Sequence, residues 1–126
     1  MDSILIVDDD IKLCATLSED LREIGYYTHF VTSADEAINY LETSDVDLVL
    51  LDLKMPNKNG FFVLNRINTN NYNPKVIVLT ANVDADSAIE SAKLGVDDFL
   101  RKPYDFDELL ITVRRVLQKE EYETSK

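Results

Sequence analysis

The amino-acid sequence predicts one α/β domain, a doubly wound five-stranded parallel sheet of order 2-1-3-4-5 with five flanking helices. Short aliphatic runs, typical of strands buried on both faces, alternate five times with segments whose apolar residues recur at helical spacing. The second strand, residues 27–32, is more polar and β-branched, which favours an edge of the sheet. Right-handed crossovers place helices on both faces.

The first predicted strand covers residues 3–7. Asp10 is placed to cap the N-terminus of the next helix, and Gly25 to end it. The apolar face of that helix consists of Leu13, Leu17, Leu21 and Ile24. A second helix follows the edge strand, with a stripe formed by Ala34, Ala37, Ile38 and Leu41.

The third strand is expected at residues 47–51, and a Pro- and Gly-containing loop at residues 55–60 leads from it into a helix that ends near Asn70. Residues 75–79 form the fourth strand. The next helix, residues 85–94, has a thin stripe of small residues, so it buries little surface and can shift at low cost.

Residues 97–100 form the fifth predicted strand. The last helix has the strongest apolar face of the chain, made by Phe106, Leu109, Leu110, Val113, Val116 and Leu117. Beyond Leu117 this face is lost. We therefore expect a domain at residues 1–119 and a polar tail, or the start of a linker, at residues 120–126.

Length and composition limit the classes of function. The chain has 126 residues, 45% of them hydrophobic, as expected for one soluble globular domain. No apolar run approaches the ~18 residues of a membrane span, and the first strand follows Met1 too closely for a signal peptide. The single cysteine, Cys14, fits a reducing cytoplasm. The net charge of −11 argues against direct binding to nucleic acids or anionic membranes.

Four predicted strands end in polar residues that could form one site. Asp8 and Asp9 follow the first strand, Asp52 the third, Thr80 the fourth and Lys102 the fifth. The carboxyl ends of parallel strands share one edge of a sheet, and the switch point between strands 1 and 3 brings the acids together. Close carboxylates call for a hard divalent cation, Mg²⁺, Mn²⁺ or Ca²⁺.

The other residue types in this set indicate phosphoryl chemistry. Asp52 is a candidate carboxylate nucleophile of the kind that forms aspartyl-phosphate. The ammonium of Lys102 suits a phosphoryl oxygen, and Pro103, a candidate for the cis form, fixes the backbone beside it. Each residue alone is a weak signal, and Asp10 is explained by helix capping. Their joint position at successive strand ends is a strong one.

Four stretches in order along the chain resemble the receiver domain of bacterial two-component response regulators. They are ILIVDDD (4–10), LVLLDLKMPNKNG (48–60), VIVLTAN (76–82) and GVDDFLRKPYDFDEL (95–109). The resemblance spans nearly the whole chain and implies a flavodoxin-like fold. It also implies a signalling protein rather than an enzyme in the ordinary sense, one that catalyses its own phosphorylation and dephosphorylation at Asp52.

The resemblance implies a role for each site residue. Asp52 accepts the phosphoryl group from a phosphohistidine of a sensor kinase or histidine phosphotransfer domain. Asp9, Asp52 and the backbone carbonyl of Lys54 bind Mg²⁺, and Asp8 holds it through water. Thr80 and Lys102 contact the phosphoryl group.

Three further positions carry regulatory roles in such domains. Phe99 stands at the position of the switch aromatic residue, which turns inward when Thr80 moves. Lys54 and Asn82 occupy the variable positions that tune dephosphorylation. The expected output surface is formed by helix 85–94, the fifth strand and the last helix, which could also mediate a phosphorylation-dependent homodimer. An output domain could follow this chain.

Three other classes share parts of the pattern. A flavodoxin-like nucleotide-binding protein would need Gly, Ser or Thr donors after the first strand, where three acids stand. A haloacid-dehalogenase-like phosphatase carries a second Asp two residues after its nucleophile, where Lys54 stands. A binding-only receiver would usually lack Asp52, Lys102 or one acid of the pair.

The remaining candidates have plain structural interpretations. His29 is predicted to be a surface residue and Cys14 a packed thiol. Tyr72 and Tyr122 lie in polar stretches and are predicted to face solvent. The charged residues Asp97, Asp98, Arg114 and Arg115 are candidates for ion pairs across a dimer, although exposed pairs of this kind are individually weak.

Overall fold

The five predicted strands form one parallel sheet of order β2-β1-β3-β4-β5, as expected. The computed structural model describes residues 2–55, 59–70, 72–81 and 92–124, with side chains up to residue 118. The strands are β1 (Ser3–Val7), β2 (Tyr27–Val31), β3 (Leu48–Leu51), β4 (Lys75–Thr80) and β5 (Asp98–Arg101). The polar strand β2 lies at an edge, which confirms the prediction made from its composition.

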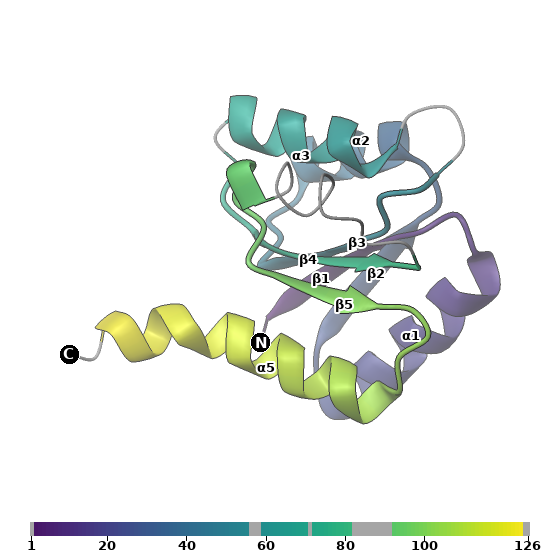
Figure 1. Ribbon diagram of the computed structural model, residues 1–126, viewed down its shortest axis with the longest axis vertical. Coiled ribbons are helices and arrows are strands. Elements are labelled where there is room, and N and C mark those ends of the chain that lie inside the picture. Colours follow the sequence, from purple (N-terminus) through teal and green to yellow (C-terminus); the bar gives the residue numbers. More distant parts are fainter. Residues whose placement is uncertain (1, 56–58, 71, 82–91, 125–126) are drawn as a thin grey trace.

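Four helices are present among the described residues: α1 (Ile11–Ile24), α2 (Ala34–Thr43), α3 (Gly60–Thr69) and α5 (Phe106–Thr124). The predicted helix 85–94 falls mostly on residues 82–91, outside the described residues; Ala92 and Lys93 are helical. Helix α5 continues past Leu117, and its C-terminal part projects from the body of the domain (Figure 1). The boundary at residue 119 stays a prediction.

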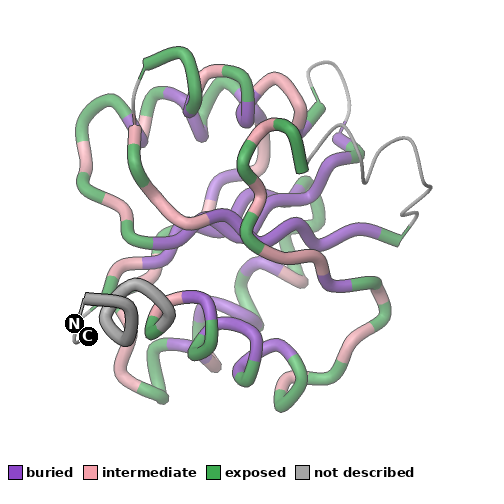
Figure 2. The backbone as a smooth tube through the Cα atoms, turned by 60° about the vertical axis from the view of Figure 1, so that its left-hand side comes forward, coloured by how far each residue is buried: buried purple, intermediate pink, exposed green. Residues whose placement is uncertain are grey.

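The sheet lies between two helical layers. Helices α2 and α3 cover one face, and α1 and α5 the other (Figure 1). Alternate strand residues point to opposite faces, so each face has its own apolar cluster. The α2/α3 cluster includes Leu5, Val7, Val49, Leu51, Val63 and Leu64. The α1/α5 cluster includes Ile4, Ile6, Leu48, Leu50, Leu17 and Leu109. The central strands β1, β3 and β4 are buried along most of their length, whereas β2 and β5, at the two edges of the sheet, have one buried residue each; the buried backbone lies between the two helical layers in Figure 2.

Side-chain caps fix where the helices begin, and thus where the loops at the sheet edge lie. Asp10 caps α1, because its Oδ1 accepts a hydrogen bond from the backbone N–H of Leu13 at 3.1 Å. Gly25 ends α1 with a φ of 122°, a conformation that favours glycine. Both roles were predicted. Asn59 caps α3 by accepting from the N–H of Phe61 at 3.0 Å.

The minor predictions had mixed outcomes. Cys14 is buried, and His29 is exposed, with its ring stacked on Tyr40 at 4.2 Å between centroids. The prediction for Tyr72 was wrong: its side chain is half-buried and packs against the α2/α3 cluster. The side chain of Tyr122 lies outside the described residues. Within the described part of the chain, no helix is both long and apolar enough to cross a bilayer.

Candidate functional site

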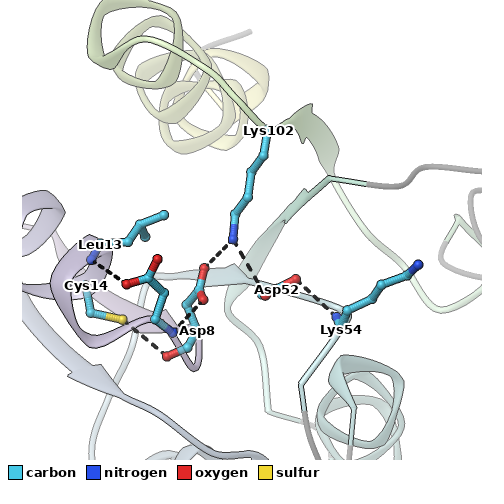
Figure 3. A network of polar contacts seen from close by, with 7 residues as sticks. Asp8, Leu13, Cys14, Asp52, Lys54 and Lys102 are labelled. Carbon is cyan, nitrogen blue, oxygen red and sulfur yellow. Dashed lines mark hydrogen bonds and ion pairs between the residues drawn. The ribbon is translucent and has the colours of Figure 1, made fainter.

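The carboxyl ends of β1, β3, β4 and β5 bring the predicted site residues together, as Figure 3 shows for Asp8, Asp52 and Lys102. Three of the polar residues are nearly inaccessible: Asp8 is 2%, Asp52 7% and Thr80 1% exposed. Asp9 is exposed. One carboxylate oxygen from each of Asp8, Asp9 and Asp52 lies within 4.8 Å of the others. The predicted convergence of the three acids is therefore present.

The Lys102 ammonium lies between two of these carboxylates. Its Nζ is 2.5 Å from Asp8 Oδ2 and 3.6 Å from Asp52 Oδ2 (Figure 3). Burial by itself would lower the pKa of Lys102, but the hydrogen bond to Asp8 and the charge of Asp52 outweigh it, so the pKa is raised. The lysine therefore stays charged and neutralises part of the negative pocket. The peptide bond between Lys102 and Pro103 is cis.

Asp52 is a carboxylate held in unfavourable surroundings. Burial raises its pKa, and the negative charges of Asp8 and Asp9 raise it further. The backbone N–H of Lys54, which donates to Asp52 Oδ1 at 3.1 Å, and the Lys102 ammonium oppose this effect only in part. A positive charge arriving beside Asp52 would thus be stabilised.

The hydroxyl of Thr80 is buried, and its Oγ1 makes no hydrogen bond within the described part of the chain. An unsatisfied buried polar group costs roughly 1–3 kcal/mol, so such groups are rare unless a ligand or a second conformation satisfies them. The hydroxyl is at the end of β4, beside the ends of the strands that carry Asp52 and Lys102. Its position fits a group that donates to an incoming oxygen.

Sequence reasoning missed Gly60, the first residue of α3. A Cβ atom here would lie 2.6 Å from the backbone oxygen of Asp52 and 2.8 Å from the Cα of Leu53. The Gly60 N–H also donates to the carbonyl of Leu53 at 2.9 Å. Glycine therefore lets α3 begin directly against the segment that carries Asp52. The sequence did contain a signal: Asn59 already serves as the helix cap, so a glycine directly after it needs another reason, such as a close approach to a neighbouring segment.

The three positions predicted to carry regulatory roles are only partly described. Phe99 is half-buried and packs against the α2/α3 cluster. The side chain of Lys54 is exposed and points away from Asp52 (Figure 3). Asn82 lies outside the described residues.

Three of the four charged residues proposed for a dimer interface, Asp97, Asp98 and Arg115, have partners within the chain. Arg115 forms an ion pair with Asp98. Asp97 accepts a hydrogen bond from the N–H of Val76 at 2.8 Å and so fixes the start of β4. The pattern of charges had suggested contacts between chains, but β5, α5 and β4 are close enough for these two acids to be used internally.

The donor set fits a hard divalent cation. Carboxylate and carbonyl oxygens are the ligands that Mg²⁺, Mn²⁺ and Ca²⁺ prefer, and Asp8, Asp9 and Asp52 offer three carboxylates within a few ångströms. Burial, and then the charges of Asp8 and Asp9, raise the pKa of Asp52, so a cation bound beside this carboxylate would stabilise its charged form. The unpartnered Thr80 hydroxyl adds a place for one further oxygen. Together these residues suit a cation and an oxyanion side by side.

Comparison with known proteins decides the family. The family model for the response regulator receiver domain matches residues 4–114. The chain belongs to the response regulator receiver domain family. Transcriptional activator protein IrlR of Burkholderia pseudomallei is 35% identical over 116 residues, which cover 92% of this receiver domain and 50% of that protein. The chain spans about half the length, or less, of the curated relatives it matches.

Solved structures agree with the family. The signal receiver domain of a putative Luxo repressor protein from Vibrio parahaemolyticus superposes with a TM-score of 0.90 at 32% identity, over 98% of this chain and 95% of that one. Response regulator TrrA of Thermotoga maritima, solved in complex with Mg²⁺-BeF, superposes with a TM-score of 0.82 at 33% identity, over 92% and 99% of the two chains. The predicted receiver fold is confirmed for the described elements.

Proposed function

We propose that this receiver domain accepts a phosphoryl group on Asp52 from a phosphohistidine of a sensor kinase or histidine phosphotransfer domain. The observation that carries the proposal is the Lys102 ammonium between Asp8 and Asp52, beside the unpartnered Thr80 hydroxyl. A carboxylate oxygen of Asp52 attacks phosphorus, the P–N bond breaks, and the imidazole leaves and takes up a proton. Catalysis of this step is mainly positioning and electrostatics.

Asp9, Asp52 and the backbone carbonyl of Lys54 would hold Mg²⁺, with Asp8 bound through water. When bound, the cation supplies positive charge where the transferring group develops negative charge. Lys102 contributes a second positive charge, and Thr80 a hydrogen bond. The complex of TrrA with Mg²⁺-BeF supports this assignment, because that relative superposes over most of the chain.

Phosphorylation adds about −1.5 to −2 charges to a pocket that already holds three acids. We propose that Thr80 and Lys102 are drawn toward this charge and that Phe99 responds to the movement of Thr80. Phe99 suits this role because it is half-buried and packs against the α2/α3 cluster, so its side chain contacts both the core and solvent. The signal would then reach the surface formed by residues 85–94, β5 and α5.

The variable positions Lys54 and Asn82 would tune how fast the aspartyl-phosphate is hydrolysed. The side chain of Lys54 is exposed and directed away from Asp52, so it does not block access of water to the Asp52 carboxylate in the resting protein. Hydrolysis by water returns Asp52 to its carboxylate. The domain thus catalyses its own phosphorylation and dephosphorylation without turning over an external substrate.

The relatives indicate which kind of protein this receiver domain belongs to. IrlR and ZraR are named as transcriptional regulators, and this chain matches only part of each. We therefore propose that the receiver, residues 1–119, acts with an output domain, joined through residues 120–126. Homodimerisation through residues 85–94, β5 and α5 would be one way to transmit the signal. Transfer from a kinase implies a location in the cytoplasm.

Incubation with acetyl phosphate and Mg²⁺, followed by intact-mass measurement, tests the proposal. We expect one phosphate on the wild-type protein and none on Asp52→Asn, and no adduct when the metal is chelated. Continuous hydrolysis of unrelated phosphate esters would instead support a phosphatase. A wild-type protein that forms no adduct would support a module that only binds partners.

A further inference from the structure

The turn between β1 and α1 carries both Asp8 and Asp9, and the structure holds their carboxylates in different ways. Asp8 Oδ1 accepts from the N–H of Asp10 at 3.0 Å, and its Oδ2 from Lys102 at 2.5 Å. The Asp9 carboxylate is exposed and has no hydrogen bond within the described part of the chain. The backbone of the turn must therefore set where the Asp9 carboxylate lies.

That backbone is held at its central peptide by a side chain of α1. The carbonyl of Asp8, which belongs to the peptide joining Asp8 to Asp9, accepts a hydrogen bond from the Cys14 thiol, with Sγ and O 3.3 Å apart (Figure 3). Among the described residues this thiol is the only partner of the carbonyl. Cys14 is 0% and Asp8 2% exposed, so bulk water does not replace the bond.

The thiol is the donor of this bond, because a carbonyl oxygen can only accept. A protonated thiol is a weak donor, and a serine hydroxyl is a stronger one. Valine has no donor but fills the pocket with apolar atoms. Substitutions at this position can therefore separate hydrogen bonding from packing.

We propose that Cys14 is a positioning residue of the metal site: its thiol fixes the Asp8–Asp9 peptide and so holds the Asp9 carboxylate where a divalent cation can reach it together with Asp52. The inference rests on the proposed function, because it takes Asp9 and Asp52 as ligands. The competing interpretation is that Cys14 merely fills the α1/α5 cluster, of which it is a member. The two interpretations predict opposite orders for valine and serine.

Binding of Mn²⁺, followed by electron paramagnetic resonance, measures the site directly. If the hydrogen bond positions Asp9, Cys14→Val weakens Mn²⁺ binding about threefold to fivefold, the effect of losing one weak S–H···O hydrogen bond, and Cys14→Ser stays within about twofold of wild type. Leu17→Ala serves as a packing control, since Leu17 is buried in the same cluster and bonds to nothing in the turn. It should lower the urea midpoint and leave Mn²⁺ affinity unchanged.

A second measurement does not require metal. In the metal-free protein the amide ¹⁵N resonance of Asp9 reports on the peptide that contains the Asp8 carbonyl. We expect it to move in Cys14→Val and to remain near its wild-type position in Cys14→Ser. Wild-type affinity in Cys14→Val, equal loss in the serine and valine variants, or an unmoved Asp9 resonance in Cys14→Val would overturn the inference.

Failure of the proposed function looks different. If Asp52→Asn bound Mn²⁺ as tightly as the wild type, the metal would not be at this cluster, and both proposals would be wrong. If Asp52→Asn lost binding while the Cys14 variants did not differ, only the positioning role would be wrong.

Discussion

Replacing Lys102 by methionine tests whether the resting site is held together by charge. The substitution keeps the apolar part of the side chain and removes the ammonium between Asp8 and Asp52. At an effective dielectric constant of about 20, a charge pair 3.6 Å apart attracts by about 5 kcal/mol, and the Asp8 contact at 2.5 Å is closer still. Part of this attraction is offset by the cost of withdrawing Lys102 from water.

The expected net loss of unfolding free energy is about 2–4 kcal/mol. Removing one member of a buried ion pair costs roughly 3–5 kcal/mol because it leaves an uncompensated charge. The Lys102 side chain is 20% exposed, so we take a lower range than for a fully buried pair. Asp8 and Asp52, with side chains only 3% and 9% exposed, are the charges left behind.

Urea unfolding at pH 7 in the absence of divalent metal measures this loss. Lys12→Met is the matched control, because Lys12 is an exposed lysine of the neighbouring helix α1 and should contribute little. The same Lys102→Met change in an Asp8→Asn background should cost about 1–2 kcal/mol less, since one stranded charge is gone. Equal effects of the Lys102 and Lys12 substitutions, or no coupling to Asp8, would refute the electrostatic account.

Four further substitutions have defined outcomes. Asp52→Asn should stabilise the metal-free protein at pH 7, because the raised pKa of Asp52 means that the folded state disfavours the charged carboxylate. Urea unfolding across a range of pH should show that this gain in stability disappears below the ordinary carboxyl pKa, where Asp52 is protonated in both the folded and the unfolded protein. Thr80→Val should stabilise the resting protein by about 1–2 kcal/mol, since it removes an unpaired buried hydroxyl, while weakening any phosphorylation-dependent change in the Phe99 resonances. Gly60→Ala should cost about 1–3 kcal/mol and slow phosphorylation by acetyl phosphate, because the new Cβ meets backbone atoms of Asp52 and Leu53; an unchanged rate would contradict this. Above the ordinary thiol pKa of 9.0, the unfolding free energy of the wild type should fall with pH more steeply than that of Cys14→Ala, by about 1.4 kcal/mol per pH unit toward pH 12, because the Cys14 thiol ionises there only in the unfolded protein. If the unfolding free energies of the two proteins changed in parallel between pH 8 and 10.5, this prediction would be wrong.

The fold could be predicted because its central strands, β1, β3 and β4, are buried on both faces. A strand such as β1 or β3 must then be a continuous aliphatic run, and that pattern is visible without any knowledge of tertiary contacts. Strand β2 was recognised as an edge strand because it is more polar than the others, which suits a strand that is partly exposed to solvent. Tyr72 was misplaced because its neighbours in sequence are polar, whereas its burial depends on the α2/α3 cluster, which only the folded chain assembles.

The sequence could predict which residues lie together at the candidate site, but not which of their atoms contact one another. Parallel strands end at one edge, so Asp8, Asp52, Thr80 and Lys102 had to be neighbours. Which carboxylate Lys102 would contact more closely depends on loop geometry that periodicity does not encode. The constraint at Gly60 and the pairing of Asp98 with Arg115 are likewise close approaches between elements distant in sequence.

The resting geometry gives a physical reason why phosphorylation could act as a switch. Lys102 compensates two acids in the resting protein, and the Thr80 hydroxyl has no partner among the residues that the structure describes. A cation bound by the acids would compensate their charge in place of Lys102. A phosphoryl group on Asp52 would then pair with the Lys102 ammonium and accept a hydrogen bond from the Thr80 hydroxyl. The resting arrangement therefore carries a cost that phosphorylation would remove. A variant that removes this cost beforehand, such as Thr80→Val, should gain stability and lose response together, and a gain in stability with an undiminished response would separate the two effects.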